Sequence, residues 1–252
     1  MMKLFSVSKR YENKKVVDDV TIDIPKGQIT SLIGPNGAGK STVLSMMSRL
    51  LSNDGGTIRL DGQEVKDWDS PKLSKKLAIL RQSNHLTVRL TVRELVSFGR
   101  FPYSKGRLKK KDWEKVDEAI AYMELEEIQD SFLDQLSGGQ KQRAFIAMVI
   151  AQDTEYILLD EPLNNLDMKH SVQIMKVLRR LVDELGKTVI VVIHDINFAS
   201  CYSDYIVALK DGRVRKQGPV DEMICRECLS DVYDMDIPVQ HINQNKICVY
   251  FA

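Results

Sequence analysis

The residues that most clearly predict chemistry form a glycine-rich loop that ends in a lysine and a serine. The loop follows the apolar run at residues 28–33 and precedes a helical segment that begins at Ser41. This strand–loop–helix context is typical of a P-loop, whose backbone N–H groups and helix N-terminus attract phosphate. The loop residues are Gly34, Pro35, Asn36, Gly37, Ala38, Gly39, Lys40 and Ser41.

The side chains at the end of this loop predict how a nucleotide with Mg²⁺ would be held. Lys40 is expected to reach the β- and γ-phosphates, and the Ser41 hydroxyl is expected to ligate Mg²⁺. Thr42 is expected to contact the α-phosphate. A glycine-rich turn with an incidental lysine is the alternative, but it does not account for the strand before the loop and the helix after it.

Two adjacent carboxylates follow a second apolar run, at residues 156–159. A carboxylate at the C-terminal end of a parallel strand, beside the P-loop strand, is placed to bind Mg²⁺, which makes Asp160 the candidate metal ligand. Glu161 comes one residue later, where it would polarise a water aimed at the γ-phosphate. An exposed acidic turn is the alternative interpretation.

A second glycine-containing segment consists of Ser137, Gly138, Gly139 and Gln140. A helix is expected to follow Ser137, so this segment forms a second anion-binding helix end. Because the P-loop already covers one side of a γ-phosphate, this second end is more useful when another copy of the chain presents it. The segment therefore favours a dimer with nucleotide between the subunits; an ordinary serine N-cap is the alternative.

The elements that position these residues are predicted from hydrophobic patterning. The continuous apolar runs 28–33, 156–159 and 188–193 predict parallel strands covered by helices on both faces. A connecting helix is expected from Lys169, with Gly186 as its C-cap. Its apolar face would consist of Val172, Met175, Leu178, Val182 and Leu185.

The N-terminal part has a different pattern and is expected to be antiparallel. Residues 16–24 alternate between apolar and polar side chains, as in a half-buried strand. Asp61 and Gly62, between the short runs 57–60 and 63–65, predict a hairpin with a tight turn.

Residues 83–135 have a helical, charged pattern without a strong strand, which predicts a helical subdomain inserted into the α/β core. Within it, residues 100–111 carry six basic side chains and no acid. A solvated face accounts for this basic stretch; a surface for anionic lipid headgroups or a partner is the functional alternative.

Composition excludes several classes. The 252 residues carry 36 Lys+Arg and 35 Asp+Glu, without the basic excess of a dedicated nucleic-acid binder. No apolar run approaches the ~20 residues of a membrane-spanning helix, and no signal-peptide pattern is present, so a cytoplasmic chain is expected. The four cysteines are expected to remain thiols. The spacing of Cys225 and Cys228 fits a zinc or redox site, or two incidental residues.

Taken in order, these motifs resemble the nucleotide-binding subunit of an ATP-binding cassette (ABC) transporter. The resemblance rests on residues 34–41, Gln82, residues 136–140 and 156–161, Asp167 and His194. It implies an α/β fold with a P-loop, RecA-like, mostly parallel sheet core, an N-terminal antiparallel β subdomain and an inserted helical subdomain. It also implies a single domain over residues 1–252, with the helical subdomain at about 83–150 and a C-terminal extension at about 219–252.

The resemblance implies a role for each matching residue. Glu161 would act as general base, with His194 and Lys40 stabilising γ-phosphate charge. Gln82 matches the glutamine that contacts Mg²⁺ and the attacking water, although it is also compatible with a polar loop. Tyr11 matches an aromatic residue that stacks on adenine, or else it is a core tyrosine. Ser137 and Gly139 match the residues that contact the γ-phosphate bound by the other subunit. Asp167 matches the carboxylate that links the two sites.

The resemblance also implies partners and cargo. It implies a homodimer that uses Mg²⁺ with ATP at the cytoplasmic face of the membrane. The expected partners are two transmembrane permease subunits and, indirectly, an extracytoplasmic solute-binding protein, without nucleic acid. Residues 96–103, 193–199 and 204–209 resemble iron–siderophore importer ATPases. Haem or cobalamin import, export, action on DNA or ribosomes, and a non-hydrolysing module are the alternatives.

The chain departs from the family pattern just before Asp167. Asn164 and Asn165 stand where many relatives have small hydroxyl residues. Hydrolysis is expected to be unaffected, whereas the coupling between the two sites is in doubt.

Overall fold

The computed structural model describes residues 1–82, 88–164 and 166–251, and a six-stranded sheet lies at its centre. The strand order is β10-β9-β3-β8-β7-β6, and every neighbouring pair except β9 and β10 is parallel. The strands are β3 (Ile29–Ile33), β6 (Leu77–Leu80), β7 (Tyr156–Asp160), β8 (Thr188–Val192), β9 (Tyr205–Lys210) and β10 (Arg213–Pro219).

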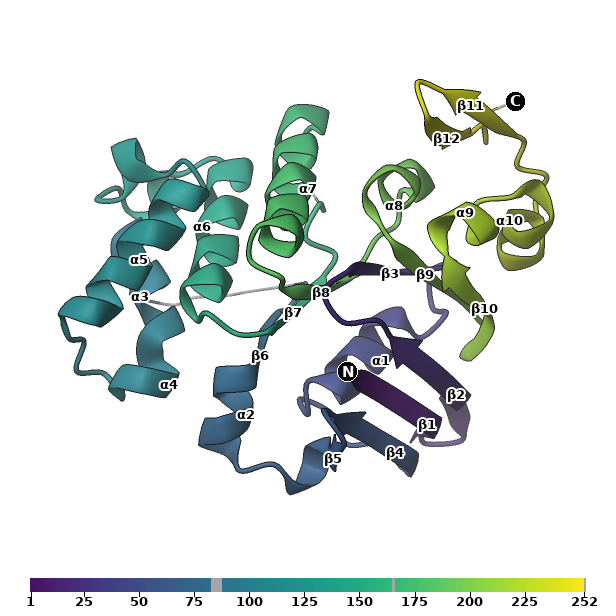
Figure 1. The fold of residues 1–252 in the computed structure, drawn as a ribbon, viewed down its shortest axis with the longest axis horizontal. Helices are drawn as coiled ribbons and strands as arrows, with labels where there is room; N and C mark the ends of the chain where they lie inside the picture. Colours follow the sequence, from purple (N-terminus) through teal and green to yellow (C-terminus); the bar gives the residue numbers. More distant parts are fainter. Residues whose placement is uncertain (83–87, 165, 252) are drawn as a thin grey trace.

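Helices cover both faces of this sheet (Figure 1). Alternate strand residues belong to two separate cores: Ile157 and Val189 pack with α7 and α8, whereas Leu158 and Ile190 pack with α1 and the antiparallel sheet. The prediction of parallel strands buried on both faces is therefore confirmed. The helices are α1 (Lys40–Met47), α2 (Ser70–Lys76), α3 (Val92–Ser97), α4 (Phe101–Ser104), α5 (Lys110–Tyr122), α6 (Gly138–Ala151), α7 (Met168–Asp183), α8 (Ile196–Tyr202), α9 (Val220–Met223) and α10 (Arg226–Tyr233).

The N-terminal strands form the expected antiparallel sheet, in the order β2-β1-β4-β5. Asp61 and Gly62 both have positive φ, 49° and 89°, as a tight hairpin turn between β4 and β5 requires. The predicted second arm was too long, because Val65 begins a 3₁₀ turn instead of continuing the strand. The strands are β1 (Met2–Tyr11), β2 (Lys14–Ile24), β4 (Gly55–Leu60) and β5 (Gln63–Glu64).

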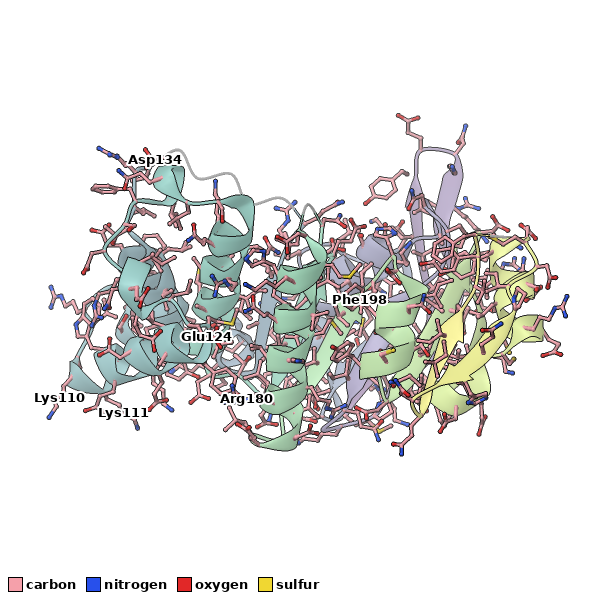
Figure 2. The ribbon with its side chains drawn as sticks, turned by 90° about the horizontal axis from the view of Figure 1, so that it is seen from above. Lys110, Lys111, Glu124, Asp134, Arg180 and Phe198 are labelled. Carbon is pink, nitrogen blue, oxygen red and sulfur yellow. The ribbon has the colours of Figure 1, made fainter. Side chains whose placement is uncertain are left out.

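Helices α3, α4, α5 and α6 form a lobe at one side of the sheet (Figure 1). Residues 88–135 form no strand of the described structure, as expected, whereas residues 83–87 lie outside the described part. The basic stretch is not uniformly solvated. Arg100 is buried, pairs with Asp112 at 3.1 Å and donates to the Ala151 carbonyl at 2.9 Å, while Lys110 and Lys111 point outward (Figure 2).

The connecting helix α7 begins at the expected place, because Asp167 caps it by accepting the His170 N–H. The predicted apolar face was wrong at its end: Leu185 lies beyond the helix and is 53% exposed. Beyond β10, helices α9 and α10 precede a hairpin of β11 (Val239–Ile242) and β12 (Asn245–Cys248). Among the described residues, no helix has the length and apolar character that crossing a membrane requires.

Candidate functional site

The sheet topology brings the loops with chemical side chains to one edge. Strands β6, β7, β8 and β3 are consecutive parallel neighbours, so their C-terminal ends lie together. Leu80 pairs with Leu159, Asp160 with Val192, and Val192 with Leu32. The segments that follow these positions therefore lie side by side, and they carry Gln82, Glu161, His194 and the P-loop.

The P-loop conformation requires its glycines. Gly34, Gly37 and Gly39 have φ values of 137°, 78° and 94°, which disfavour residues with a Cβ. A Cβ at Gly34 would also lie 1.9 Å from the Leu209 carbonyl oxygen. Helix α1 begins directly after Gly39, so its free N–H groups face the loop.

Lys40 is folded back onto the loop. Its Nζ donates to the carbonyl oxygens of Gly34 and Pro35, at 2.8 and 2.9 Å, and the residue is buried. Burial lowers the pKa of Lys40, while the nearby carboxylates of Glu161 and Asp160 act in the opposite direction. A phosphate in the loop would give this poorly solvated ammonium an anionic partner.

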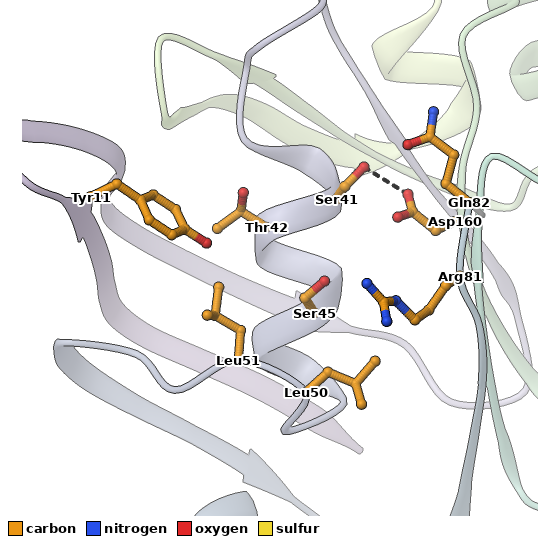
Figure 3. Close-up of a pocket in the computed structure, with 9 residues that line it drawn as sticks. All are labelled: Tyr11, Ser41, Thr42, Ser45, Leu50, Leu51, Arg81, Gln82 and Asp160. Carbon is orange, nitrogen blue, oxygen red and sulfur yellow. Dashed lines mark hydrogen bonds between the residues drawn. The ribbon is translucent and has the colours of Figure 1, made fainter. Parts of the chain in front are cut away.

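Ser41 and Asp160 form the candidate metal position. The Ser41 hydroxyl donates to Asp160 Oδ1 at 2.7 Å (Figure 3), and burial raises the pKa of Asp160. A cation would offset the cost of this buried carboxylate. Mg²⁺ prefers oxygen ligands and is often bound by one or two carboxylates together with substrate phosphates, so the two residues fit Mg²⁺ with a nucleotide.

Glu161 lies at the centre of a polar cluster. Its Oε1 is 2.6 Å from His194 Nε2, and its Oε2 accepts a hydrogen bond from Gln82 Nε2 at 2.6 Å. The side-chain amide of Asn164 donates to the same Oε2. Glu161 also has a φ of 52°, a strained value for a residue with a long side chain, and such strain is concentrated at functional sites.

A cavity of about 380 Å³ extends from this edge along α1. Figure 3 shows Tyr11 at one end and Asp160 with Gln82 at the other, with α1 between them. Tyr11 is half exposed, so it is not a core tyrosine. The remaining lining residues are Ser41, Thr42, Ser45, Leu50, Leu51 and Arg81. A second cavity, lined by Glu161, Asn164 and His194, adjoins the first through the bond between Gln82 and Glu161.

The segment 137–140 does not join this cavity within one chain. Ser137 and Gln140 cap the start of α6 reciprocally: Ser137 Oγ accepts the Gln140 N–H, and Gln140 Oε1 accepts the Ser137 N–H. Gly139 packs closely on α7, because a Cβ there would lie 3.1 Å from the His170 ring. Gly139 is therefore buried, whereas Ser137 and Gly138 at the same helix end are exposed and accessible to another molecule.

Asp167 also lies outside the cavity, at the N-terminus of α7. Its Oδ1 is 2.8 Å from His170 Nδ1, and the hydrogen bonds from His170 lower the pKa of Asp167. Asn164 and Asn165 are the two residues that depart from the family pattern before Asp167. Asn164 contacts Glu161, whereas Asn165 lies outside the described residues.

Sequence reasoning missed two contacts at this site. The Tyr233 hydroxyl accepts the Gly34 N–H at 3.1 Å, a contact across 199 positions that no local pattern indicates. The contact of Asn164 with Glu161 is the second, although Asn164 departs from the family pattern. The sequence signal for this contact is the position of Asn164, a polar residue three positions after the candidate base Glu161.

Comparisons with known proteins agree with this geometry. Residues 17–164 match the family model described as ABC transporter. The chain is 63% identical to the petrobactin import ATP-binding protein YclP of Bacillus subtilis (strain 168) over the full length of both. It is 50% identical to the petrobactin import ATP-binding protein FatE of Bacillus anthracis, covering 99% of this chain and 100% of that one. A dimeric ATP-binding cassette in a post-hydrolysis state, bound to ADP and Pi, superposes with a TM-score of 0.77 at 34% identity, covering 87% of this chain and 99% of that one.

Proposed function

Because this chain belongs to the ABC transporter family, we propose that it is the ATP-hydrolysing subunit of an importer that takes up a ferric siderophore across the cytoplasmic membrane. The observation that carries the proposal is the position of Glu161 between Gln82 and His194, beside the Ser41–Asp160 pair. We further propose that residues 1–252 act as one nucleotide-binding domain, with the helical subdomain at about 83–150 and a C-terminal extension at about 219–252.

In this proposal the first cavity holds ATP. Tyr11 stacks on the adenine at one end, and Gly34, Pro35, Asn36, Gly37, Ala38 and Gly39 surround the phosphates at the other. Lys40 exchanges its carbonyl partners for the β- and γ-phosphates, and Thr42 contacts the α-phosphate. Ser41, Asp160 and Gln82 would hold Mg²⁺, which would neutralise the negative charge of the phosphates when bound.

Glu161 is the proposed general base. Its carboxylate accepts a proton from water while Gln82 and His194 hold both of its oxygens in place, which lowers the entropic cost of alignment. His194 and Lys40 supply positive or donor groups toward the γ-phosphate as its charge develops. The positive φ of Glu161 turns the chain directly after β7, so this carboxylate stays at the edge of the sheet.

The second copy of the chain completes each site in this proposal. The open N-terminus of α6, formed by Ser137, Gly138, Gly139 and Gln140, faces the γ-phosphate held by the other subunit. Asp167, next to α6 through His170, then links one site to the other. The dimeric, ADP- and Pi-bound relative at 34% identity supports this arrangement.

Two relatives support the cargo and the location. YclP and FatE are both named petrobactin import ATP-binding proteins. We therefore propose that the cargo is ferric petrobactin or a related ferric siderophore. The chain would act at the cytoplasmic face of the membrane on two permease subunits, with an extracytoplasmic binding protein delivering the solute.

The test is growth of a deletion strain on single iron sources. The strain is expected to grow poorly on ferric petrobactin and normally on ferric citrate or haem, with growth restored by the intact gene. Normal growth on every ferric siderophore, with loss on haem or cobalamin, would refute the cargo while leaving ATP hydrolysis in place. Recovery of the purified chain with ribosomes or DNA instead of a permease would refute transport itself.

A further inference from the structure

Two cysteines lie together at the start of α10, away from the nucleotide cavity. Cys225 is the N-cap residue, and its Sγ accepts the Cys228 N–H at 3.4 Å. Burial raises the pKa of Cys225, and its hydrogen bond with the Cys228 side chain adds to this effect. Cys225 and Cys228 thus interact with each other across the first turn of α10, in the C-x-x-C spacing found in dithiol redox motifs.

A cation contacts one of the two sulfurs. Lys216, on the neighbouring strand β10, places Nζ 2.9 Å from Cys228 Sγ, and the contact with Cys228 raises the pKa of Lys216. The thiolate is the nucleophilic form of cysteine, and this ammonium lies where it would contact a negative charge on the Cys228 sulfur. The surroundings thus distinguish Cys228, whose sulfur contacts the Lys216 ammonium and the Glu222 carbonyl oxygen, from Cys225, whose pKa burial raises.

The other cysteines lack these features. Cys248 is fully buried, and burial raises its pKa to about 11. The pKa of Cys201 is also raised by burial, and its surroundings add the negative charge of Asp195. No further metal ligands accompany Cys225 and Cys228, since the described part of the chain holds no cluster of three or more His, Cys, Asp or Glu residues suited to a metal ion.

We propose that Cys225 and Cys228 form a thiol–disulfide exchange site that low-molecular-weight disulfides oxidise reversibly. The Cys228 thiolate attacks a disulfide RSSR, forming Cys228–S–S–R and releasing RS⁻. The Cys225 thiol then loses its proton to solvent and attacks the Cys228 sulfur, forming the Cys225–Cys228 disulfide and releasing a second RS⁻. Two protein thiols are oxidised and one small disulfide is reduced to two thiols.

The experiment treats the reduced full-length chain with 2-hydroxyethyl disulfide and follows intact mass and peptide maps. The wild type is expected to lose two hydrogens at Cys225–Cys228, and Cys225→Ser is expected to accumulate a mixed disulfide at Cys228. Serine keeps an N-cap acceptor at position 225, so α10 should remain folded. Cys228→Ser is expected to leave Cys225 in its reduced form over the same period.

Lysine variants test the assignment of the nucleophile. Lys216→Gln is expected to slow the first exchange about threefold or more, with Lys216→Arg retaining most of the rate. Lys176→Gln, on the exposed part of α7, serves as the matched control and should match the wild type. Equal reactivity of Cys201 and Cys228, no adduct in Cys225→Ser, or an unchanged rate in a folded Lys216→Gln would each overturn the proposal.

Discussion

His194 Nε2 lies 2.6 Å from Glu161 Oε1, which joins the segment after β8 to the segment after β7. Gln82, after β6, binds the other oxygen of the same carboxylate. Three neighbouring parallel strands thus each supply one member of the cluster. Because the strands are fixed by the buried sheet, the carboxylate is aligned before any nucleotide arrives, and the predictions below depend on that alignment.

Replacing His194 should slow hydrolysis more than binding. His194→Ala removes the group next to Glu161 and, in our account, a donor to the γ-phosphate, so the rate constant of phosphate release should fall about 100-fold. The KM for ATP should change little. His241→Ala, in the exposed hairpin strand β11, is the matched control and should behave as the wild type. A wild-type rate for His194→Ala would exclude this residue from the reaction.

Neutralising Asp160 should stabilise the nucleotide-free fold while abolishing Mg²⁺-dependent activity. Burial raises the pKa of Asp160, so the folded chain binds this proton more tightly than the unfolded chain does. The stability that the protonated form contributes is complete below the unfolded pKa and is lost as pH rises through the folded pKa.

Asp160→Asn should therefore melt at a higher temperature than the wild type at pH 7, with the difference shrinking as pH falls toward 4. Asparagine can still accept the Ser41 hydroxyl, so the loop should keep its shape. Thermal melts over a pH series, without nucleotide, measure the difference. A lower melting temperature at pH 7 would show that the carboxylate stabilises the fold.

Tyr11 should set nucleotide affinity through its ring. Tyr11→Ala is expected to raise the KM for ATP about tenfold, since base–aromatic stacking contributes ~1–3 kcal/mol. Tyr11→Phe keeps the ring and should remain within about twofold of the wild type. If the phenylalanine variant were as impaired as the alanine variant, the hydroxyl and not stacking would be responsible.

The open end of α6 should be needed for ATP-dependent dimers. Ser137→Asp keeps an N-cap acceptor, so the helix should remain folded, but it places a negative charge where the other subunit's γ-phosphate would lie. In a Glu161→Gln background, ATP should give dimers with Ser137→Asn and monomers with Ser137→Asp, measured by size exclusion with light scattering. Dimers of both variants would argue against a phosphate at this helix end.

The local parts of the site were predictable from sequence, because each depends on a short motif. The positive φ angles of Gly34, Gly37 and Gly39 follow from the loop pattern, and the capping of α6 by Ser137 follows from its spacing to Gln140. The continuous apolar runs likewise predicted strands covered on both faces.

The remaining features depend on tertiary contacts. The sequence pattern of residues 100–111 favours a solvated basic stretch, yet Arg100 is buried. Its charge is balanced by Asp112, and its guanidinium donates a hydrogen bond to the Ala151 carbonyl. The contact of Tyr233 with Gly34 joins distant segments, so no periodicity predicts it. Strand order, which decides that Gln82, Glu161 and His194 meet, also follows from packing of the whole sheet.

The most direct test of the account is single-turnover phosphate release by Glu161→Gln compared with the wild type, with ATP affinity measured in parallel. Glutamine has the size of glutamate but accepts no proton, so release should fall by about 100-fold or more while ATP still binds. Glu155→Gln, an exposed surface change, is the control and should hydrolyse normally. Phosphate release by Glu161→Gln at the wild-type rate would contradict the central role given to this carboxylate.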